Sequence, residues 1–395
     1  MGTDRAAEGA CLSEPELLAW LTLSLCIDGR PGAWLRLADA YGGAAEVVAA
    51  DDEQLATSGA SPAAIALLRD AASRSAKVLE TCRRLAIEIA PRGSPGYPEI
   101  LAGIPDPPIV LFFRGAPPSK LSDGREADPD DENAALVSVA IVGARRCTAY
   151  GERTARRLGR EVAEAGIVVT SGLARGIDGA AHRGALEAGR TLAVLAGGLD
   201  RVYPGEHREL ADRIVDKGGS LVSEQPPGAR PLAWLFPYRN RIITGVSAAT
   251  VVVEASHRSG SLASVRHALE QGREVFAVPG PIDSPACEGT NQLLVDGAPP
   301  FCRLTDLRIV RGLSKRIELT TSKHLHEKKI SLATMSPDEA SLLTAIRAGA
   351  ATPDEIMTAT ALDGTRVLTL LTALELDGLV RREDHGRFRA TVRGV

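Results

Sequence analysis

Residues 137 to 300 repeat one structural unit, and this repeat is the feature that most constrains the fold. Each unit is a short apolar run rich in β-branched residues, followed by a loop of Gly, Ser and Arg and then by a helical pattern. Strands that alternate with helices pair in parallel through right-handed crossovers, and the loops after such strands gather at the carboxyl edge of the sheet. We therefore predict an α/β fold with an extended Rossmann-like, mostly parallel sheet, and we expect the functional site at that edge. The expected strands are 137–142, 167–170, 191–195, 250–254 and 274–278.

The composition is ordinary for a soluble globular protein, with 44% apolar and 24% charged residues among 395. A chain of this length predicts two or three domains. The apolar run at 17–27 contains Thr22 and Ser24 and is too short to cross a bilayer, so we expect no membrane partner. Six cysteines show no Cys-x-x-Cys spacing. We therefore expect reduced thiols in a cytoplasmic protein, and no metal site.

The net charge of −4 conceals an asymmetry along the chain. Residues 1–136 carry 12 Lys and Arg against 21 Asp and Glu, whereas residues 137–302 carry 19 against 17 and residues 303–395 carry 15 against 12. The acidic excess of the first part is best interpreted as a solubilising surface. Any binding of a polyanion must then come from arginines clustered in loops and not from the net charge.

Residues 1–90 are predicted to form a helical module. Ser13 and Glu16 have the spacing of a capping box ahead of an apolar run, and glycine-rich breaks at 42–43 and 58–60 separate further amphipathic stretches. Short helices joined by glycine turns are typical of protein-packing modules such as SAM-like domains, and also of helix-hairpin-helix units that hold a nucleic-acid phosphate. The acidic composition favours the packing module, and both interpretations stay open.

Residues 91–305 are predicted to form the Rossmann-like domain. A proline-rich lead-in is followed by an expected edge strand at 109–113, because proline is confined to the starts and edges of strands. Residues 117–134 are polar and acidic and predict a surface loop without site chemistry. Residues 306–331 are basic and polar and predict a linker.

Residues 332–395 show three helical patterns and then a charged strand pair, which together predict a winged-helix domain. Residues 365–376 take the position of the recognition helix. This segment carries Arg366 as its only base and ends with Glu375, so it is poorly equipped to read a major groove. A protein-docking role is at least as well supported as DNA binding.

The loops at the predicted carboxyl edge suit an anionic polymer. Helix N-termini bind anions through free amides, glycine permits close approach, and arginine adds bidentate phosphate contacts. Bases of a single strand also stack on aromatic rings, which Tyr203, Phe236 and Tyr238 supply. The candidate DNA-binding residues are Gly143, Arg145, Arg146, Ser171, Gly172, Arg175, Gly176, Gly197, Gly198, Arg239, Asn240, Arg241, Ser259, Gly260 and Ser261.

Signatures of catalysis and of cofactor binding are missing from the sequence. The core contains no Gly-x-Gly-x-x-Gly turn, and no nucleophile elbow, zinc-protease or Walker pattern occurs. His182 lies one helical turn from Asp178, which suits a base with its orienting acid or an ordinary hydrogen bond on a helix face. Glu254 at a strand end is the best single acid, and we expect it to hold loop amides or an arginine. We predict a binding protein without a cofactor, not an enzyme.

At this point the motifs themselves resemble a known family. The strings VAIVGARRCTAYG, VTSGLARGIDGAAHRGAL, GGLDRVYP, SEQPPG, FPYRNRIITG, VVVEASHRSGSLASVRHALEQGREVFAVPG and EGTNQLLVDGA occur in this order between residues 139 and 298. They resemble the DprA/Smf family of bacterial DNA-processing proteins, as does the lead-in PGYPEILAGIPDPPIVLFFRG. The flanking helical and winged-helix modules match that family's common architecture.

The resemblance implies a cytoplasmic protein that binds single-stranded DNA in a basic pocket of the Rossmann-like domain. It further implies a homodimer formed through that domain and loading of the recombinase RecA during natural transformation. The family's strand-end, SGLARGID, RNR and SGSL motifs fall on 143–145, 171–178, 239–241 and 259–262. Ala144 stands where Ser is usual, Tyr238 where a base is frequent, and Ser264 where Thr is common.

Two further hypotheses come from other classes of protein. The core also resembles, more distantly, lysine-decarboxylase-like phosphoribohydrolases, which handle nucleotides through a PGGxGT loop. The nearest strings, at 196–198 and 259–261, do not complete that motif, which favours binding over catalysis. A regulator that reads duplex DNA through the winged helix is disfavoured by the single base of the recognition segment.

Overall fold

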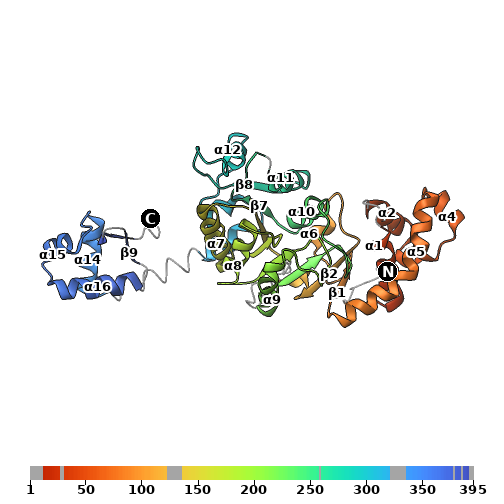
Figure 1. Cartoon of the computed structure of the whole chain (residues 1–395), viewed down its shortest axis with the longest axis horizontal. Coiled ribbons are helices and arrows are strands. Elements are labelled where there is room, and N and C mark those ends of the chain that lie inside the picture. The colour runs from red at the N-terminus through yellow and green to blue at the C-terminus, as the bar shows by residue number, and fades with distance from the viewer. Residues whose placement is uncertain are drawn as a thin grey trace, which may run out of the picture. The chain divides into compact units, whose positions relative to one another are not determined.

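The computed structural model describes residues 12–26, 31–121, 136–257, 259–320, 335–376, 379–383 and 386–390 (Figure 1). The chain divides into two compact units between residues 318 and 319. In the described part of the chain, no helix combines the length and the apolar character needed to cross a membrane.

The first unit is built around one eight-stranded sheet with the strand order β1-β2-β6-β5-β4-β3-β7-β8. The six strands from β6 to β8 in this order pair in parallel, whereas β1 and β2 pair antiparallel with their neighbours. The predicted mostly parallel α/β sheet is confirmed. Its strands are β1 (Glu88–Pro91), β2 (Val110–Gly115), β3 (Ser138–Val142), β4 (Val168–Ser171), β5 (Thr191–Val194), β6 (Ser220–Ser223), β7 (Ala249–Val252) and β8 (Glu274–Ala277).

Three details of the sheet differ from the sequence prediction. The strand expected at an edge, β2, lies between β1 and β6. The edge strand is β1, which was not predicted because residues up to 90 were expected to belong to the helical module. The proline-rich lead-in gave the wrong position because its prolines precede β2 and leave the β2 amides free to pair on both sides. Strand β6 was not predicted, because its four residues include two serines, Ser220 and Ser223, which are fully buried in the sheet.

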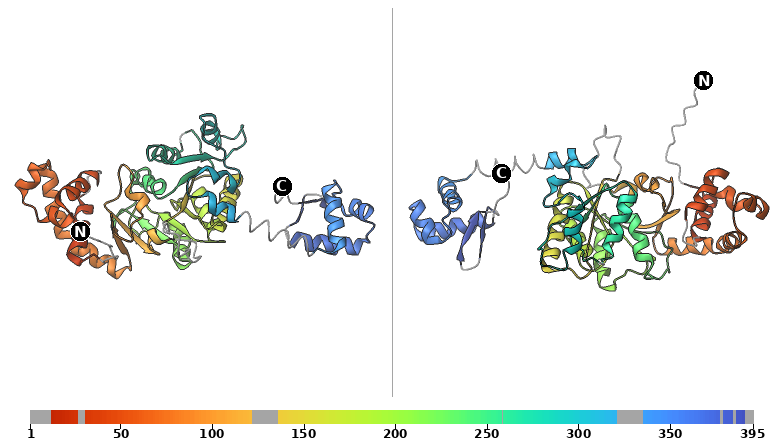
Figure 2. Two further views of the ribbon diagram at one scale, coloured as in Figure 1. Left: turned by 180° about the vertical axis from the view of Figure 1, so that it is seen from behind. Right: turned by 90° about the horizontal axis from the view of Figure 1, so that it is seen from above.

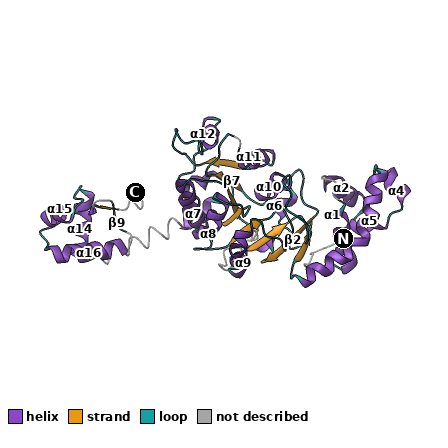
Figure 3. Ribbon diagram, in the orientation of Figure 1, coloured by secondary structure: helices purple, strands orange, loops and turns teal. Residues whose placement is uncertain are grey.

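Helices cover both faces of the sheet, and residues that alternate along each strand meet different helices (Figures 1 and 3). Ile141 and Val169 pack with α7 (Ala149–Glu164) and α8 (Ile177–Ala185) on one face. Ala140 and Val142 pack with α10 (Leu235–Gly245) and α11 (Ser261–Glu270) on the other face. Two further views show the same layering (Figure 2). The remaining short elements of the core are α6 (Glu99–Ala102), η1 (Pro118–Lys120), η2 (Gly205–His207), α9 (Arg208–Asp216) and α12 (Glu288–Val295).

The N-terminal residues are helical, as the sequence predicts. Ser13 and Glu16 form the expected capping box, in which the serine hydroxyl accepts from the Glu16 amide and the Glu16 carboxylate accepts from the Ser13 amide. Gly42 and Gly59 take the left-handed φ values of +89° and +92° in two of the turns. The helices are α1 (Glu14–Leu25), α2 (Pro31–Tyr41), α3 (Ala44–Ala49), α4 (Asp52–Thr57) and α5 (Pro62–Arg84).

The segment predicted as a linker begins as part of the first unit. Residues 304–309 form the 3-10 helix η3 (Leu304–Ile309) and residues 314–320 are helical. Leu307, Val310, Leu313 and Ile317 are buried against the face of the sheet that α7 covers. The arginines and lysines between these leucines and isoleucines hid their helical spacing. The rest of the expected linker up to 331, and the acidic loop after Leu121, lie mostly outside the described residues.

The second unit has the predicted winged-helix fold. Three helices, α14 (Pro337–Arg347), α15 (Pro353–Thr360) and α16 (Gly364–Leu376), are followed by the two-stranded antiparallel ribbon of β9 (Val380–Arg382) and β10 (Phe388–Ala390). Its core combines residues of all three helices with Val380 and Phe388 of the ribbon.

Candidate nucleic-acid interface

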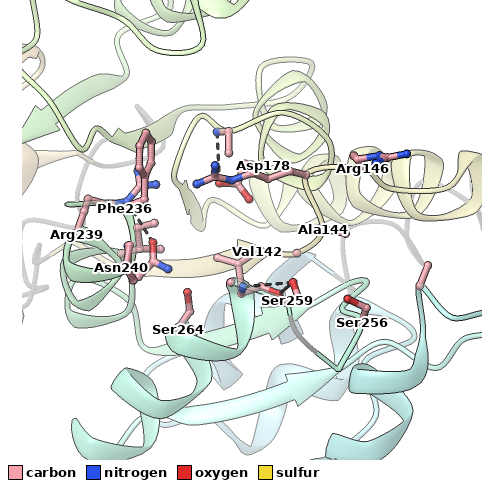
Figure 4. Close-up of a pocket in the computed structure, with 18 residues that line it drawn as sticks. Val142, Ala144, Arg146, Asp178, Phe236, Arg239, Asn240, Ser256, Ser259 and Ser264 are labelled. Atoms are coloured by element: carbon pink, nitrogen blue, oxygen red, sulfur yellow. Dashed lines mark hydrogen bonds between the residues drawn. The ribbon is translucent and has the colours of Figure 1, made fainter. Parts of the chain in front are cut away.

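An open pocket of about 520 Å³ lies at the carboxyl edge of the parallel sheet, where β3 ends and α8, α10 and α11 begin (Figure 4). The sequence prediction placed the functional site at this edge. Eight of the candidate residues line the pocket together, and seven do not. Those in the pocket are Gly143, Arg145, Arg146, Arg239, Asn240, Ser259, Gly260 and Ser261.

The loop after β3 is fixed by close backbone contacts. A Cβ on Gly143 would lie 2.7 Å from Ile177 and 2.9 Å from the carbonyl oxygen of Glu254. Gly176 takes a φ of +72°, and a Cβ there would lie 2.3 Å from the carbonyl oxygen of Ala144. Both positions therefore require glycine. Their close backbone contacts fix the position of the loop that carries Arg145.

Arg145 and Arg146 are the exposed cations of the pocket. The guanidinium carbon of Arg145 lies 4.7 Å from the centroid of the Phe236 ring, which orders the side chain through a cation–π contact. No described residue forms an ion pair with Arg145, and none does with Arg146. Both guanidinium groups therefore have donors available for a phosphate.

A buried charge pair supports the pocket from beneath. The Asp178 carboxylate accepts from the amide of Gly172 at 3.1 Å, and Arg239 donates to the carbonyl oxygens of Gly172, at 2.9 Å, and of Val194. Burial lowers the pKa of Arg239 to about 10, and the negative charge of Asp178 opposes this effect. Burial raises the pKa of Asp178. Arg239 thus stays charged near neutral pH and gives the pocket floor a positive potential, but its donors already serve the backbone.

Serine hydroxyls and the start of α11 form the opposite wall of the pocket. Ser256, Ser259, Ser261 and Ser264 line it, and the hydroxyls of Ser259 and Ser261 lie 2.7 Å apart (Figure 4). The amino end of a helix carries a partial positive charge and unpaired amides. This wall therefore suits a phosphate oxygen. Ser256 and Ser264 were not among the candidate residues.

The candidates of the loop after β4 lie outside the pocket. Ser171 is fully buried and donates its hydroxyl to the carbonyl oxygen of Ile141 at 2.6 Å. Arg175 is exposed, but Glu206 accepts from two of its guanidinium nitrogens at 2.8 Å and 2.7 Å. This hydrogen bonding lowers the pKa of Glu206. The second loop thus contributes backbone support and an arginine that an acid already holds.

Gly197 and Gly198 also serve the backbone, not the pocket. A Cβ on Gly198 would lie 2.6 Å from the carbonyl oxygen of Pro226, and a Cβ on Gly197 would lie 3.0 Å from the nitrogen of Pro231. The amide of Gly198 donates to Ala229 at 3.0 Å. These glycines let the loop that contains 226–231 pack against the end of β5.

Arg241 is buried and tied to acids. It donates to Glu224 at 2.7 Å and to Asp106 at 3.1 Å, and its guanidinium lies 4.0 Å from the centroid of the Tyr238 ring. Burial alone lowers the pKa of Arg241, but Glu224 and its other partners outweigh that effect and raise it. The three residues 239–241 therefore divide: Arg239 and Asn240 reach the pocket, and Arg241 fastens α10 to the segment that precedes β2.

An exposed aromatic ledge continues from the pocket. Phe236 lines the pocket, and its ring centroid lies 5.5 Å from that of Tyr203, which is 50% exposed. Trp234 is 58% exposed and was not singled out from the sequence, although a tryptophan in a loop between prolines is a signal that could have found it. Tyr238, the third predicted aromatic, is occupied by Arg241 and by a hydrogen bond to Asp106 at 3.0 Å.

The predicted relation between His182 and Asp178 is wrong in both of its forms. His182 is fully buried and shares a hydrogen bond with the hydroxyl of Thr191 at 2.7 Å, while Asp178 accepts from loop amides. Desolvation lowers the pKa of His182 to about 3. A helical spacing of four residues placed the two on one face, but their partners come from β5 and from the loop after β4.

Glu254 holds a loop amide, as the sequence predicted. Its carboxylate is fully buried and accepts from the amide of Thr148 at 2.9 Å and from the Thr148 hydroxyl at 2.5 Å. It thereby fixes the start of α7, where a Cβ on Gly151 would lie 2.3 Å from the carboxyl carbon. Among the described residues, no group of three or more His, Cys, Asp and Glu side chains is placed to hold a metal ion.

These features define an extended Rossmann-like core with a basic strand-end pocket, joined in one chain to a winged helix. The profile of the family described as DNA recombination-mediator protein A matches residues 88–310, and that of the DprA winged helix domain matches residues 327–386. The first match covers more than half of the chain. The chain therefore belongs to the DprA/Smf family of DNA-processing proteins.

Individual relatives agree with this assignment. The DNA processing protein DprA of Bacillus subtilis is 42% identical over 232 residues, which are 58% of this chain and 73% of the relative. A putative DNA processing protein DprA of Mycobacterium tuberculosis is 43% identical over 284 residues, which are 71% of this chain and 68% of the relative. The X-ray structure of DprA from Streptococcus pneumoniae superposes with a TM-score of 0.58 at 30% identity and covers 72% of this chain and 94% of its own.

Proposed function

We propose that this protein binds single-stranded DNA in the pocket at the carboxyl edge of its sheet. The observation that carries the proposal is the pairing of Arg145 with Phe236 opposite the start of α11. A guanidinium with free donors takes a phosphate, and a partly exposed ring beside it takes a base. Sequence-independent binding of a single strand needs these two elements side by side.

The shape of the interface favours a single strand over a duplex. Base faces must be unpaired to stack on the neighbouring rings of Phe236 and Tyr203, and a duplex keeps them stacked in its interior. The serine wall and the amides at the start of α11 supply contacts to the backbone and not to base edges. We therefore propose binding with little dependence on sequence.

We further propose that the bound strand is handed to a recombinase, RecA, during natural transformation, with the protein acting as a homodimer through the Rossmann-like domain. Membership of the DprA/Smf family supports this role. The B. subtilis and S. pneumoniae relatives are themselves described as DNA processing proteins. On this proposal the protein is a mediator and not an enzyme.

The hydrolase alternative has no support from the site. The carboxylate of Glu254, its best candidate acid, is fully buried and is held by Thr148. It does not line the pocket. Turnover of a nucleoside monophosphate by the wild-type chain, lost in the Glu254→Gln variant, would restore that alternative.

The test is the binding of a fluorescently labelled oligothymidylate by Arg145→Gln. Each lost contact to a single-strand phosphate lowers the log–log salt slope by about 0.7, which corresponds to about fivefold in affinity at about 0.1 M salt. Arg213→Gln is the matched control, because Arg213 lies exposed on α9 and outside the pocket. Equal affinities and salt slopes for Arg145→Gln and the control would refute the pocket as the binding site.

A further inference from the structure

The winged-helix unit separates its charges between two parts. Residues 335–377 carry two arginines against seven acidic residues, whereas residues 381–395 carry five arginines against two acidic residues. The basic part contains the antiparallel ribbon of β9 and β10, which follows the three helices in the chain (Figure 1). An anionic partner of this unit would therefore be attracted to the ribbon and repelled by the helices.

The register of the ribbon sets two arginines against each other. Arg381 on β9 lies directly opposite Arg389 on β10, and both are exposed. Like charges directly opposite in an antiparallel pair destabilise it. Arg381 forms no ion pair with any described residue, and Glu383 approaches Arg389 only to 3.7 Å. The pair is thus an unfavourable arrangement for the isolated protein, and an anion between the two would relieve it.

The other side chains of the ribbon pack against the core of the unit. Val380 and Phe388 are buried in the core of the unit, and the guanidinium of Arg382 lies 5.9 Å from the centroid of the Phe388 ring. Since side chains alternate between the two faces of a strand, Arg381 and Arg389 face away from this core. Packing therefore explains Arg382, whereas Arg389 has only its contact to Glu383 and Arg381 has no ion pair with any described residue.

The recognition helix α16 lacks the donors that base reading needs. Arg366 donates to Asp338 at 2.9 Å, and the hydroxyls of Thr369 and Thr372 donate to carbonyl oxygens of their own helix. Leu368, which precedes Thr369 on the same helix, is 54% exposed. A helix with this surface is poorly equipped to read base edges in a major groove, so a nucleic-acid contact of this unit would come from the wing and not from the helix.

We infer that Arg381 and Arg389 form a second backbone-binding site, which holds phosphates of a single DNA strand extending beyond the pocket of the core. The inference rests on the proposed single-strand binding by the core. Opposed guanidinium groups, of which Arg381 has no ion pair with a described residue and Arg389 has one long contact to Glu383 at 3.7 Å, match successive phosphates by charge. The absence of base-reading donors on α16 makes the contact independent of sequence. The second site adds to the affinity only for strands long enough to occupy both sites.

The experiment uses the full chain, an Arg381→Gln/Arg389→Gln double variant, and labelled oligothymidylates of two lengths, a short one that fills the pocket alone and a long one. Losing two single-strand contacts flattens the salt slope by about 1.4 and weakens the long strand about 25-fold at about 0.1 M salt. The short strand should bind as it does to the wild type. Arg347→Gln/Arg366→Gln is the matched control, because it removes the same charge from the same unit away from the wing.

Two further measurements keep the outcomes distinct. Thermal unfolding, together with an Arg381→Lys/Arg389→Lys variant that keeps the charge, separates a lost contact from a misfolded wing. Long-strand affinity equal to that of the control variant overturns the inference, and so does a loss confined to blunt duplex DNA. Failure of the short strand to bind even the wild type would instead refute the proposed function of the core.

Discussion

Replacing Arg241 by methionine should destabilise the first unit without removing a DNA contact. The side chain of Arg241 is 4% exposed and so is that of Glu224, its partner at 2.7 Å. Removing one member of a buried ion pair leaves the other charge unpaired in the interior, which costs about 3–5 kcal/mol. Asp106 and the hydroxyl of Tyr238 lose the same partner, so the upper part of that range applies.

The assay is urea denaturation of the full chain, with single-strand binding measured in parallel under native conditions. Arg241→Met should lower the midpoint of the core transition, and Arg241→Met/Glu224→Gln should recover much of the loss because the buried carboxylate is then neutral. The resemblance to the family marked Arg241 as a DNA contact, but its burial argues against that role. The affinity for oligothymidylate should therefore stay within about twofold of the wild-type value. An unchanged denaturation midpoint together with a lost salt-dependent contact would refute the reasoning.

Three further outcomes are expected. Glu206→Gln should release Arg175 and tighten single-strand binding by up to about fivefold at about 0.1 M salt, with a salt slope steeper by about 0.7. The control Glu209→Gln, on the neighbouring helix α9, should change neither quantity, and equal effects of the two variants would mean that Arg175 makes no DNA contact. Phe236→Leu should cost about 1–3 kcal/mol of binding free energy with an unchanged salt slope, because a stacking face and no charge is lost; a flatter slope in titrations across salt would assign Phe236 only to the ordering of Arg145. The third concerns pH: His182 has a pKa lowered to about 3 by burial, so below its ordinary pKa of 6.5 the unfolded chain binds a proton that the folded chain refuses. Stability should therefore fall as the pH drops from 6.5 toward 3, by up to about 1.4 kcal/mol per pH unit, and denaturation curves of His182→Gln should show a weaker pH dependence than those of the wild type.

The elements with strong periodicity were predictable from the sequence. Five parallel strands, the helices between them and the winged helix each carry a local pattern of apolar residues and glycines, and local patterns determine local structure. The strand β6 and the buried helical segment after Leu304 were missed because serines in the one and basic residues in the other interrupt that pattern. The edge position given to β2 was wrong because strand order depends on pairing between distant segments.

The candidate site was predictable as a place and only partly as a set of residues. The alternation of strands and loops predicts that Gly143, Arg145 and the 259–261 turn meet at one edge, and they do line one pocket. Arginine content alone did not distinguish Arg145, which is exposed beside Phe236, from Arg175, which Glu206 holds. Glu206 lies 31 residues from Arg175, and Glu224 lies 17 residues from Arg241. No local sequence pattern therefore predicts these ion pairs.

The sequence by itself determined the sheet edge at which the chain presents its arginines, because strand alternation and glycine loops are properties of short segments. Only the tertiary structure decided which arginines remain free. Residues 239 and 241 are separated by about 200° around the axis of α10, so one faces the pocket and the other faces Asp106, which lies 135 residues earlier in the chain. A charge becomes a binding group or a structural one according to what packs against it, and that is settled by the fold.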